Sequence, residues 1–171
     1  SYGDLDLPII DELPPGRKSV ITGWISGRKR RELYRFIREK LKAGIQAYFV
    51  YPLIEESDEL DLKSAREAAD RLQKDIFSDF RVCLLHGRMR REEKERIMDS
   101  FREKKIHILV STTVIEVGID IPNASLMLIE NAERFGLAQL HQLRGRIGRG
   151  ARQSYCFLLT GQKISPQAKE R

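Results

Sequence analysis

The chain has few of the residues and segments that define several special classes of protein. It holds only two cysteines, and because Cys83 and Cys156 both lie inside apolar runs, reduced core thiols are favoured over a disulfide or a metal site. No apolar run approaches the roughly 20 residues that cross a bilayer, and the first residues lack the pattern of a secretory signal. Glycine and proline are too few for a collagen-like or low-complexity chain. We therefore expect a globular protein of the cytoplasm, with no membrane segment and no metal centre.

Positive charge exceeds negative charge in this sequence. The 31 lysines and arginines outnumber the 25 acidic residues, which gives a formal net charge of +6 and an isoelectric point near 9.4. The excess is concentrated between Arg17 and Lys42, whereas residues 55–61 carry only acidic charges. A basic excess permits a polyanionic partner such as nucleic acid, but a charged helix face is more often simply solvated. The cluster Arg28–Arg31 is consistent with either interpretation.

Apolar runs alternate with helical patterns from residue 19 onward. Apolar residues recur at helical spacing in residues 33–41, 65–77 and 97–101. Nearly continuous apolar runs between such helices are typical of parallel strands that are covered on both faces. The expected strands are Ser19–Ile25, Gln46–Tyr51, Arg81–Leu85, Ile106–Ser111, Ser125–Glu130 and Ser154–Leu159. The sequence therefore predicts an α/β fold of three layers, with helices on both sides of a mainly parallel sheet.

Two more helical segments and two terminal segments complete the predicted organisation. A short helical turn is expected at Thr113–Val117 and a longer helix at Phe135–Arg146. Residues 1–18 combine prolines, glycines and acidic pairs without a regular apolar pattern, as a linker does. Residues 161–171 contain a Ser-Pro pair typical of a helix start, which indicates the beginning of a following segment. The folded domain is expected to span residues 19–160.

The strongest chemical signal is an arginine-rich turn after the last predicted helix. Four arginines fall within nine residues that include no acidic residue; they are Arg144, Arg146, Arg149 and Arg152. The planar, permanently charged guanidinium group matches a phosphoryl group with two hydrogen bonds. Gly145 and Gly148 separate the arginines and permit close approach of the backbone. The segment predicts phosphate binding, and its spacing leaves open whether the phosphate belongs to a nucleotide or to a nucleic-acid backbone.

Two other polar segments follow predicted strands, where the chemistry of parallel sheets collects. Residues 111–113, Ser-Thr-Thr, offer hydroxyl groups for phosphates, and the carboxylate of Asp120 can accept a hydrogen bond from a ribose hydroxyl. The same residues also fit an ordinary Ser/Thr cap of a short helix, and the pattern favours neither interpretation. His86-Gly87 ends another strand, and Arg88 adds positive charge where a helix N-terminus already attracts anions.

Together these segments resemble the second RecA-like lobe of superfamily 2 helicases over residues 19–159. The arginine-finger motif of that family, Gln-x-x-Gly-Arg-x-x-Arg, is present as Gln142 to Arg149, and residues 86–87 and 111–120 match two further motifs. The segments VYPLIEES, LLHGRM and FGLAQLHQLRGRIGRG are most similar to bacterial members that remodel stalled forks and branched DNA. The resemblance implies a RecA-like lobe of an ATP-dependent DNA helicase that acts in recombination and repair in the bacterial cytosol.

The resemblance also implies a role for each matching residue. Arg146 and Arg149 would be catalytic arginine fingers for ATP bound on an N-terminal RecA-like lobe, and such fingers are worth about 10³–10⁵ in rate. The nucleotide-binding residues would be Gln142, Gly118 and Asp120. The contacts to backbone phosphates of branched or forked DNA would come from Thr112, Thr113, Gly87 and Arg88.

The sequence holds only half of an ATP site. It contains no Gly-x-x-x-x-Gly-Lys-Ser/Thr loop, so ATP and Mg²⁺ would be held mainly by the other lobe, and this chain would not hydrolyse ATP alone. Three alternatives remain at this point. They are a lobe of the related transcription-repair coupling translocase, a lobe of an RNA helicase, and a nucleic-acid-binding module without a catalytic role.

Overall fold

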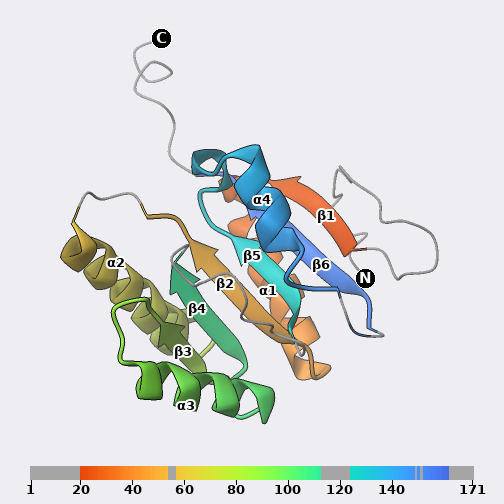
Figure 1. The fold of residues 1–171 in the computed structure, drawn as a ribbon. Coiled ribbons are helices and arrows are strands. Elements are labelled where there is room, and N and C mark those ends of the chain that lie inside the picture. Colours follow the sequence, from red (N-terminus) through yellow and green to blue (C-terminus); the bar gives the residue numbers. More distant parts are fainter. Residues whose placement is uncertain (1–19, 54–56, 113–123, 149, 151, 162–171) are drawn as a thin grey trace.

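A sheet of parallel strands forms the centre of the molecule (Figure 1). The computed structural model describes residues 20–53, 57–112, 124–148, 150 and 152–161. In these residues the strands are β1 (Val20–Ile25), β2 (Gln46–Tyr51), β3 (Val82–Leu85), β4 (Ile108–Thr112), β5 (Ala124–Ile129) and β6 (Ser154–Leu159). Their spatial order is β1-β6-β5-β2-β4-β3, and every pairing is parallel. The predicted α/β class is therefore confirmed, and all the predicted strands are present.

Helices cover both faces of the sheet, as the continuous apolar strands require (Figure 1). The helices are α1 (Arg30–Lys42), α2 (Asp58–Arg71), α3 (Arg91–Arg102) and α4 (Leu137–Arg144). Three short turns accompany them: η2 (Gly27–Lys29), the π-helical η3 (Leu72–Ile76) and η4 (Ala132–Arg134). One core cluster joins α1 and η3 to the sheet, and a second joins α3 and α4 to the opposite face.

The core beneath α1 is rich in aromatic side chains. Phe36 of α1 meets the rings of Tyr155 and Phe157 in β6 edge to face, with centroids 5.3 and 5.6 Å apart. Phe49 of β2 makes a similar contact with Phe77, at 6.1 Å. Because edge-to-face ring pairs add to the stabilisation from burial, this face is a firm scaffold for the residues that α1 carries.

The last predicted helix is shorter than its sequence pattern indicated. It was expected over Phe135–Arg146, but α4 begins at Leu137 and ends at Arg144. Phe135 is extended, with φ −94° and ψ 145°, and its side chain is buried. Phe135 matches the helical spacing of apolar residues because its side chain is buried. Its backbone, however, lies at the end of η4 and before the first residue of α4.

Several predicted segments lie outside the described residues. They are the linker at residues 1–18, the helical turn at Thr113–Val117 and residues 162–171. None of the helices in the described part of the chain has both the length and the apolar character that a membrane crossing requires.

Candidate functional site

The carboxyl ends of the strands meet at one edge of the sheet, because all the strands are parallel. Tyr51, at the end of β2, is in register with Thr112 at the end of β4. On its other side β2 pairs with β5, so that Glu130, the residue after β5, lies beside Tyr51. The turn at His86 follows β3, which is the neighbour of β4. The structure thus brings the predicted DNA contacts Thr112 and Gly87 to the same edge.

The hydroxyl groups at the end of β4 are buried. Ser111 and Thr112 are 0% and 2% exposed, and their side-chain oxygens have no hydrogen-bond partner among the described residues. A buried hydroxyl without a partner is costly, so such groups are typical of positions that bind a ligand or a neighbouring segment. The location fits the prediction that this strand end binds phosphate.

His86 organises the turn that carries Gly87 and Arg88. Its Nδ1 accepts a hydrogen bond of 3.1 Å from the backbone N–H of Arg88, and its carbonyl oxygen accepts one of 3.1 Å from Met89. The imidazole is buried, Gly87 is half-buried and Arg88 is exposed. The buried histidine therefore shapes the turn, and the guanidinium group of Arg88 is presented at its surface. Sequence reasoning identified this segment but not the role of the ring.

The arginine-rich segment lies elsewhere on the molecule. Gln142 is exposed near the end of α4, Arg146 is half-buried, and Ile147 is only 5% exposed in the core under α3 and α4. Gly148 has φ +86°, and a Cβ atom there would stand 2.6 Å from Cγ2 of Val20. Only glycine satisfies both conditions without strain.

The contact of Gly148 with Val20 places the arginine-rich segment at the start of β1. Val20 is in register with Ser154, so these two residues are the first of β1 and β6. Gly148 therefore lies at the amino ends of β1 and β6, whereas Thr112 and Gly87 lie at the carboxyl edge. The fold separates Arg146, two residues before Gly148, from these predicted DNA contacts because α4 runs back along the sheet. Gly145, in contrast, has an ordinary helical φ of −66°.

Four of the predicted site residues lie outside the described residues. They are Arg149, Thr113, Gly118 and Asp120. Their assignments remain predictions from the sequence.

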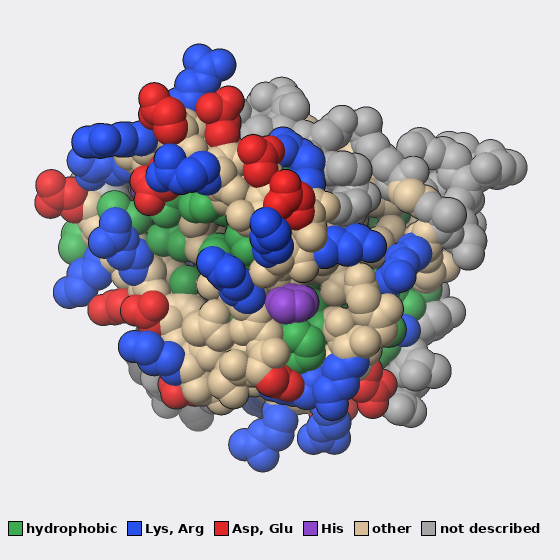
Figure 2. Space-filling view, turned by 90° about the horizontal axis from the view of Figure 1, so that it is seen from below, with side chains coloured by type: hydrophobic (Ala, Val, Ile, Leu, Met, Phe, Trp, Pro, Cys, Tyr) green, Lys and Arg blue, Asp and Glu red, His purple; other side chains and the backbone are tan. Residues whose placement is uncertain are grey.

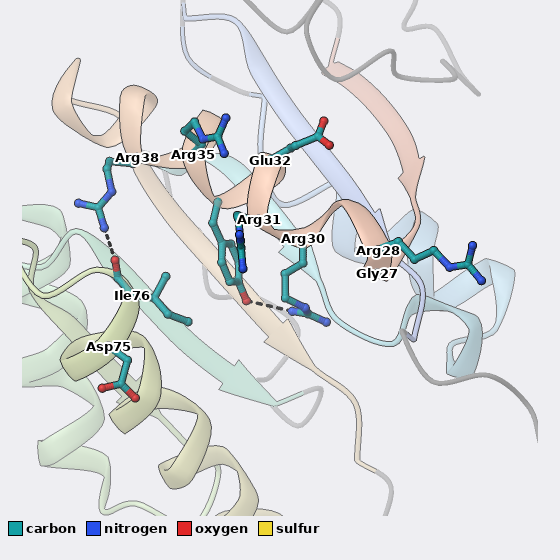
Figure 3. Close-up of a pocket in the computed structure, with 10 residues that line it drawn as sticks. Gly27, Arg28, Arg30, Arg31, Glu32, Arg35, Arg38, Asp75 and Ile76 are labelled. Carbon is teal, nitrogen blue, oxygen red and sulfur yellow. Dashed lines mark hydrogen bonds between the residues drawn. The ribbon is translucent and has the colours of Figure 1, made fainter.

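The carboxyl edge also holds an ion pair that the sequence pattern did not indicate. Arg30, the first residue of α1, donates two hydrogen bonds to the carboxylate of Glu130, at 2.5 and 3.0 Å. The Glu130 side chain is 5% exposed and that of Arg30 is 30% exposed. Arg30 also donates to the hydroxyl of Tyr34 at 2.9 Å (Figure 3). One member of the Arg28–Arg31 cluster is therefore engaged internally. The only hint of this pair in the sequence was Glu130, a single carboxylate at the end of an apolar run.

The ion pair changes the titration of its neighbours. Burial raises the pKa of the Tyr51 and Tyr34 hydroxyls, and the negative charge of Glu130 raises them further. Burial by itself lowers the pKa of Arg30, but the hydrogen bond and charge of Glu130 more than reverse this, so the net pKa is raised. Arg30 therefore stays charged, and both tyrosines stay neutral, throughout the physiological pH range.

The remaining arginines of this region line an open groove of about 910 Å³ between α1 and η3 (Figure 3). Arg38 crosses it to pair with Asp79 at 2.5 Å, and this hydrogen bond is the main reason that the pKa of Asp79 is lowered. On the side of the molecule seen from below, basic and acidic side chains are mixed (Figure 2).

The described residues suit the phosphates of a nucleotide better than a metal ion. Arg146 supplies a permanent cation on the α4 segment, whereas no three His, Cys, Asp or Glu side chains of the described residues cluster as a metal site requires. Arg146 fits a contribution to the triphosphate of ATP, and the described residues offer no cluster that would hold the accompanying Mg²⁺ by themselves.

Known proteins match almost the whole chain. The family described as helicase conserved C-terminal domain matches residues 28–151. The ATP-dependent DNA helicase RecG of Thermotoga maritima is 56% identical over 170 residues, which are 99% of this chain and 22% of that protein. RecG of Escherichia coli O157:H7 is 50% identical over 172 residues, or 100% of this chain and 25% of that protein. The chain thus spans about a fifth to a quarter of the length of these relatives.

Solved structures agree with this match. The structure of RecG bound to a three-way DNA junction superposes with a TM-score of 0.71 and 52% identity, over 99% of this chain and 22% of that one. Domain 2 of the DEAD-box helicase Mss116p bound to an RNA duplex gives 0.63 and 19% identity, over 81% of this chain and 53% of that one, and shares the fold alone. On its motifs, its parallel sheet and these matches, the chain belongs to the helicase conserved C-terminal domain family and has the RecA-like fold of superfamily 2 helicases.

Proposed function

We propose that this chain is the second motor lobe of an ATP-dependent DNA helicase that remodels branched DNA, such as stalled forks and Holliday junctions, in recombination and repair in the bacterial cytosol. The observation that carries the proposal is the match, at 52% identity over 99% of the chain, to RecG bound to a three-way DNA junction. Residues 19–160 form the lobe, residues 1–18 join it to the N-terminal RecA-like lobe, and residues 161–171 begin a following segment.

In this proposal, Gln142 of α4 and the arginine-rich segment that follows it face the nucleotide. ATP supplies the triphosphate, which the N-terminal lobe holds together with Mg²⁺. Arg146 and Arg149 contribute positive charge to the γ-phosphate, Gln142 supports that contact, and Gly118 and Asp120 lie near the ribose. Two features support Arg146 in this role: the buried anchor Ile147 next to it and the turn at Gly148. A fixed backbone keeps a charged group oriented without a cost of rearrangement during the reaction.

The carboxyl edge faces the DNA. Thr112 and Thr113, with Gly87 and Arg88, contact backbone phosphates, which hold the strand without reading its sequence. Support comes from the buried hydroxyl of Thr112, which has no hydrogen-bond partner within the described part of the chain, and from the exposed turn at Arg88. Because Arg146 and Thr112 lie toward opposite edges of one sheet, closure of the lobes around ATP would displace the DNA contacts along the strand.

The test uses the full-length protein that contains this chain. Replacing Arg146 by alanine should lower the kcat of DNA-stimulated ATP hydrolysis by about 10³-fold, because the charge that develops on the phosphoryl group loses a finger. Arg134→Ala is the matched control, since Arg134 is an exposed arginine of η4 in the same connection. Turnover of the Arg146 variant close to that of the control, with intact folding, would contradict the finger assignment.

The choice of nucleic acid needs a separate measurement. A three-way DNA junction should stimulate ATP hydrolysis more strongly than a linear DNA duplex or a structured RNA of equal length. Equal stimulation by RNA would favour an RNA helicase instead. Finger variants that retain full turnover, combined with salt-dependent DNA binding, would favour a non-catalytic binding module.

A further inference from the structure

The ion pair between Arg30 and Glu130 joins two segments that lie 100 residues apart in the sequence. Arg30 begins α1, and Glu130 directly follows β5, where the connection to α4 starts. Helix α1 packs on β6 through Phe36, and Arg30, its first residue, lines one pocket together with Tyr51 and Glu130 at the ends of β2 and β5. The ion pair therefore ties the connection before α4 to the helix on the opposite face of the sheet.

Net stabilisation alone is a weak explanation for such a pair. Removing two charges from water offsets most of their attraction, and apolar side chains of similar size often stabilise a fold equally well. The pair does fix the orientation of the two side chains relative to each other, because a forked guanidinium group that makes two hydrogen bonds to one carboxylate permits a single arrangement. The hydroxyl of Tyr34 on α1 holds the same fork through a third hydrogen bond, at 2.9 Å. The geometry is suited to fixing a position.

The connection that follows Glu130 depends on such ties. Asn131 adopts the left-handed conformation, with φ 49°, and the N–H of Glu130 donates to the carbonyl oxygen of Val50 at 2.8 Å. The carboxylate of Glu133 accepts a hydrogen bond of 3.0 Å from the N–H of Gly161, just after β6. In α4 itself Leu140 is the one buried residue, at 8% exposure. Because α4 buries so little of its own surface, the residues that precede it set the position of its N-terminal end.

We infer that Arg30 and Glu130 are positioning residues for the arginine-finger segment. The pair holds the β5-to-α4 connection in one orientation against α1 and thereby places Gln142 and Arg146 for the nucleotide. Neither residue touches the nucleotide itself. The inference deepens the proposed function and rests on its assignment of Arg146 as a finger.

The test measures steady-state ATP hydrolysis by the full-length protein with a three-way DNA junction. Glu130→Gln, which keeps the shape but removes the charge, should lower kcat about tenfold and change KM for ATP less than twofold, because small misplacements of a reacting group lower the rate steeply. Arg30→Lys, which keeps the charge and loses the fork, should lower kcat by an intermediate factor. Hydrogen exchange should accelerate at least tenfold in residues 131–146 and remain unchanged in β1 and β6.

Two further variants separate positioning from stability. Asp79→Asn removes the partner of Arg38 on the same helix α1, and it should leave kcat and the exchange of residues 131–146 unchanged. The double variant Arg30→Met with Glu130→Met replaces both charges by apolar side chains, which should return Tm close to the wild-type value. Its kcat should nevertheless stay about tenfold low, because the directional fork is absent.

Each outcome has a distinct meaning. Recovery of kcat together with Tm in the double methionine variant would overturn the inference and leave the pair a purely structural role. An unchanged kcat in Glu130→Gln would overturn it as well, while a strong loss in Arg146→Ala would leave the proposed function intact. If Arg146→Ala turns over normally, the finger assignment fails, and the positioning inference that rests on it fails with it.

Discussion

The helices α1 and α4 cover opposite faces of one sheet and are held in contrasting ways (Figure 1). The 13 residues of α1 bury a complete apolar stripe, which consists of Leu33, Phe36, Ile37 and Leu41. The 8 residues of α4 bury Leu140, and Leu137 in its first turn is 72% exposed. A helix of two turns does not persist without tertiary contacts. Its stability must come from the residues at its two ends.

This difference separates the scaffold from the functional element. α1 is packed against aromatic side chains of the sheet and can tolerate exposed charges on its outer face. α4 carries Gln142 and leads into Arg146, two of the predicted nucleotide contacts, and it is anchored by Ala132 and Phe135 before it and by Ile147 after it, all buried. Segments with few buried contacts open at lower free energy than the core, which suits an element that must respond to a ligand.

The first prediction compares one buried residue from each helix. Ile37→Ala should lower the free energy of unfolding by about 2–5 kcal/mol, because it leaves a cavity in a fully packed core. Leu140→Ala should cost about 2 kcal/mol or less, since Leu140 already borders a cavity of about 390 Å³ under α4. Urea unfolding of the two variants measures the difference. A larger loss from Leu140→Ala would show that α4 is as much part of the scaffold as α1.

The second prediction concerns the turn at the far end of α4. Gly148→Ala should destabilise the chain by about 1–3 kcal/mol, because φ is +86° and the new methyl group would collide with Val20. Gly145→Ala is the matched control, since its φ of −66° suits any residue and it should change stability by less than about 1 kcal/mol. Thermal unfolding distinguishes the two, and equal effects would mean that the turn at Gly148 can relax freely.

The third prediction uses a thiol beneath α4. Burial raises the pKa of Cys156 from 9.0 to about 12, and nearby Arg144 lowers it slightly. Because the folded pKa exceeds the unfolded one, the contribution of this thiol to stability is complete below pH 9. It then declines by about 1.4 kcal/mol per pH unit as the pH rises toward 12.

Cys156→Ala should remove this loss of stability at alkaline pH. Cys83→Ala, in the edge strand β3 away from β6, should retain it. The measurement is urea unfolding of both variants and the wild type between pH 8 and about 10.5. If Cys156→Ala loses stability as steeply as the wild type, the thiol is reached by solvent, and α4 covers β6 less tightly than the structure indicates.

Local patterns in the sequence predicted most of the framework. Each strand was recognisable as a short apolar run, and the stripe from Leu33 to Leu41 indicated α1 directly. The segment around Phe135 was assigned to a helix wrongly, because a buried side chain in an extended turn has the same spacing as one on a helix face. The matching motifs also singled out Gln142 and Arg146 as candidates, whose roles remain predictions, and only the fold showed that Arg146 lies near the amino ends of β1 and β6.

By itself the sequence determined the fold class, the helicase family and the residue types available for phosphate, because periodicity and motifs are properties of neighbouring residues. Tertiary structure alone decided which charges meet. Arg30 belonged to a basic cluster in the sequence, and only the packing of α1 on the sheet brought it to Glu130. It also decided that Arg146 and Thr112 lie toward opposite edges of the sheet. The physical reason is that pairing and separation depend on strand order and helix direction, which long-range packing sets.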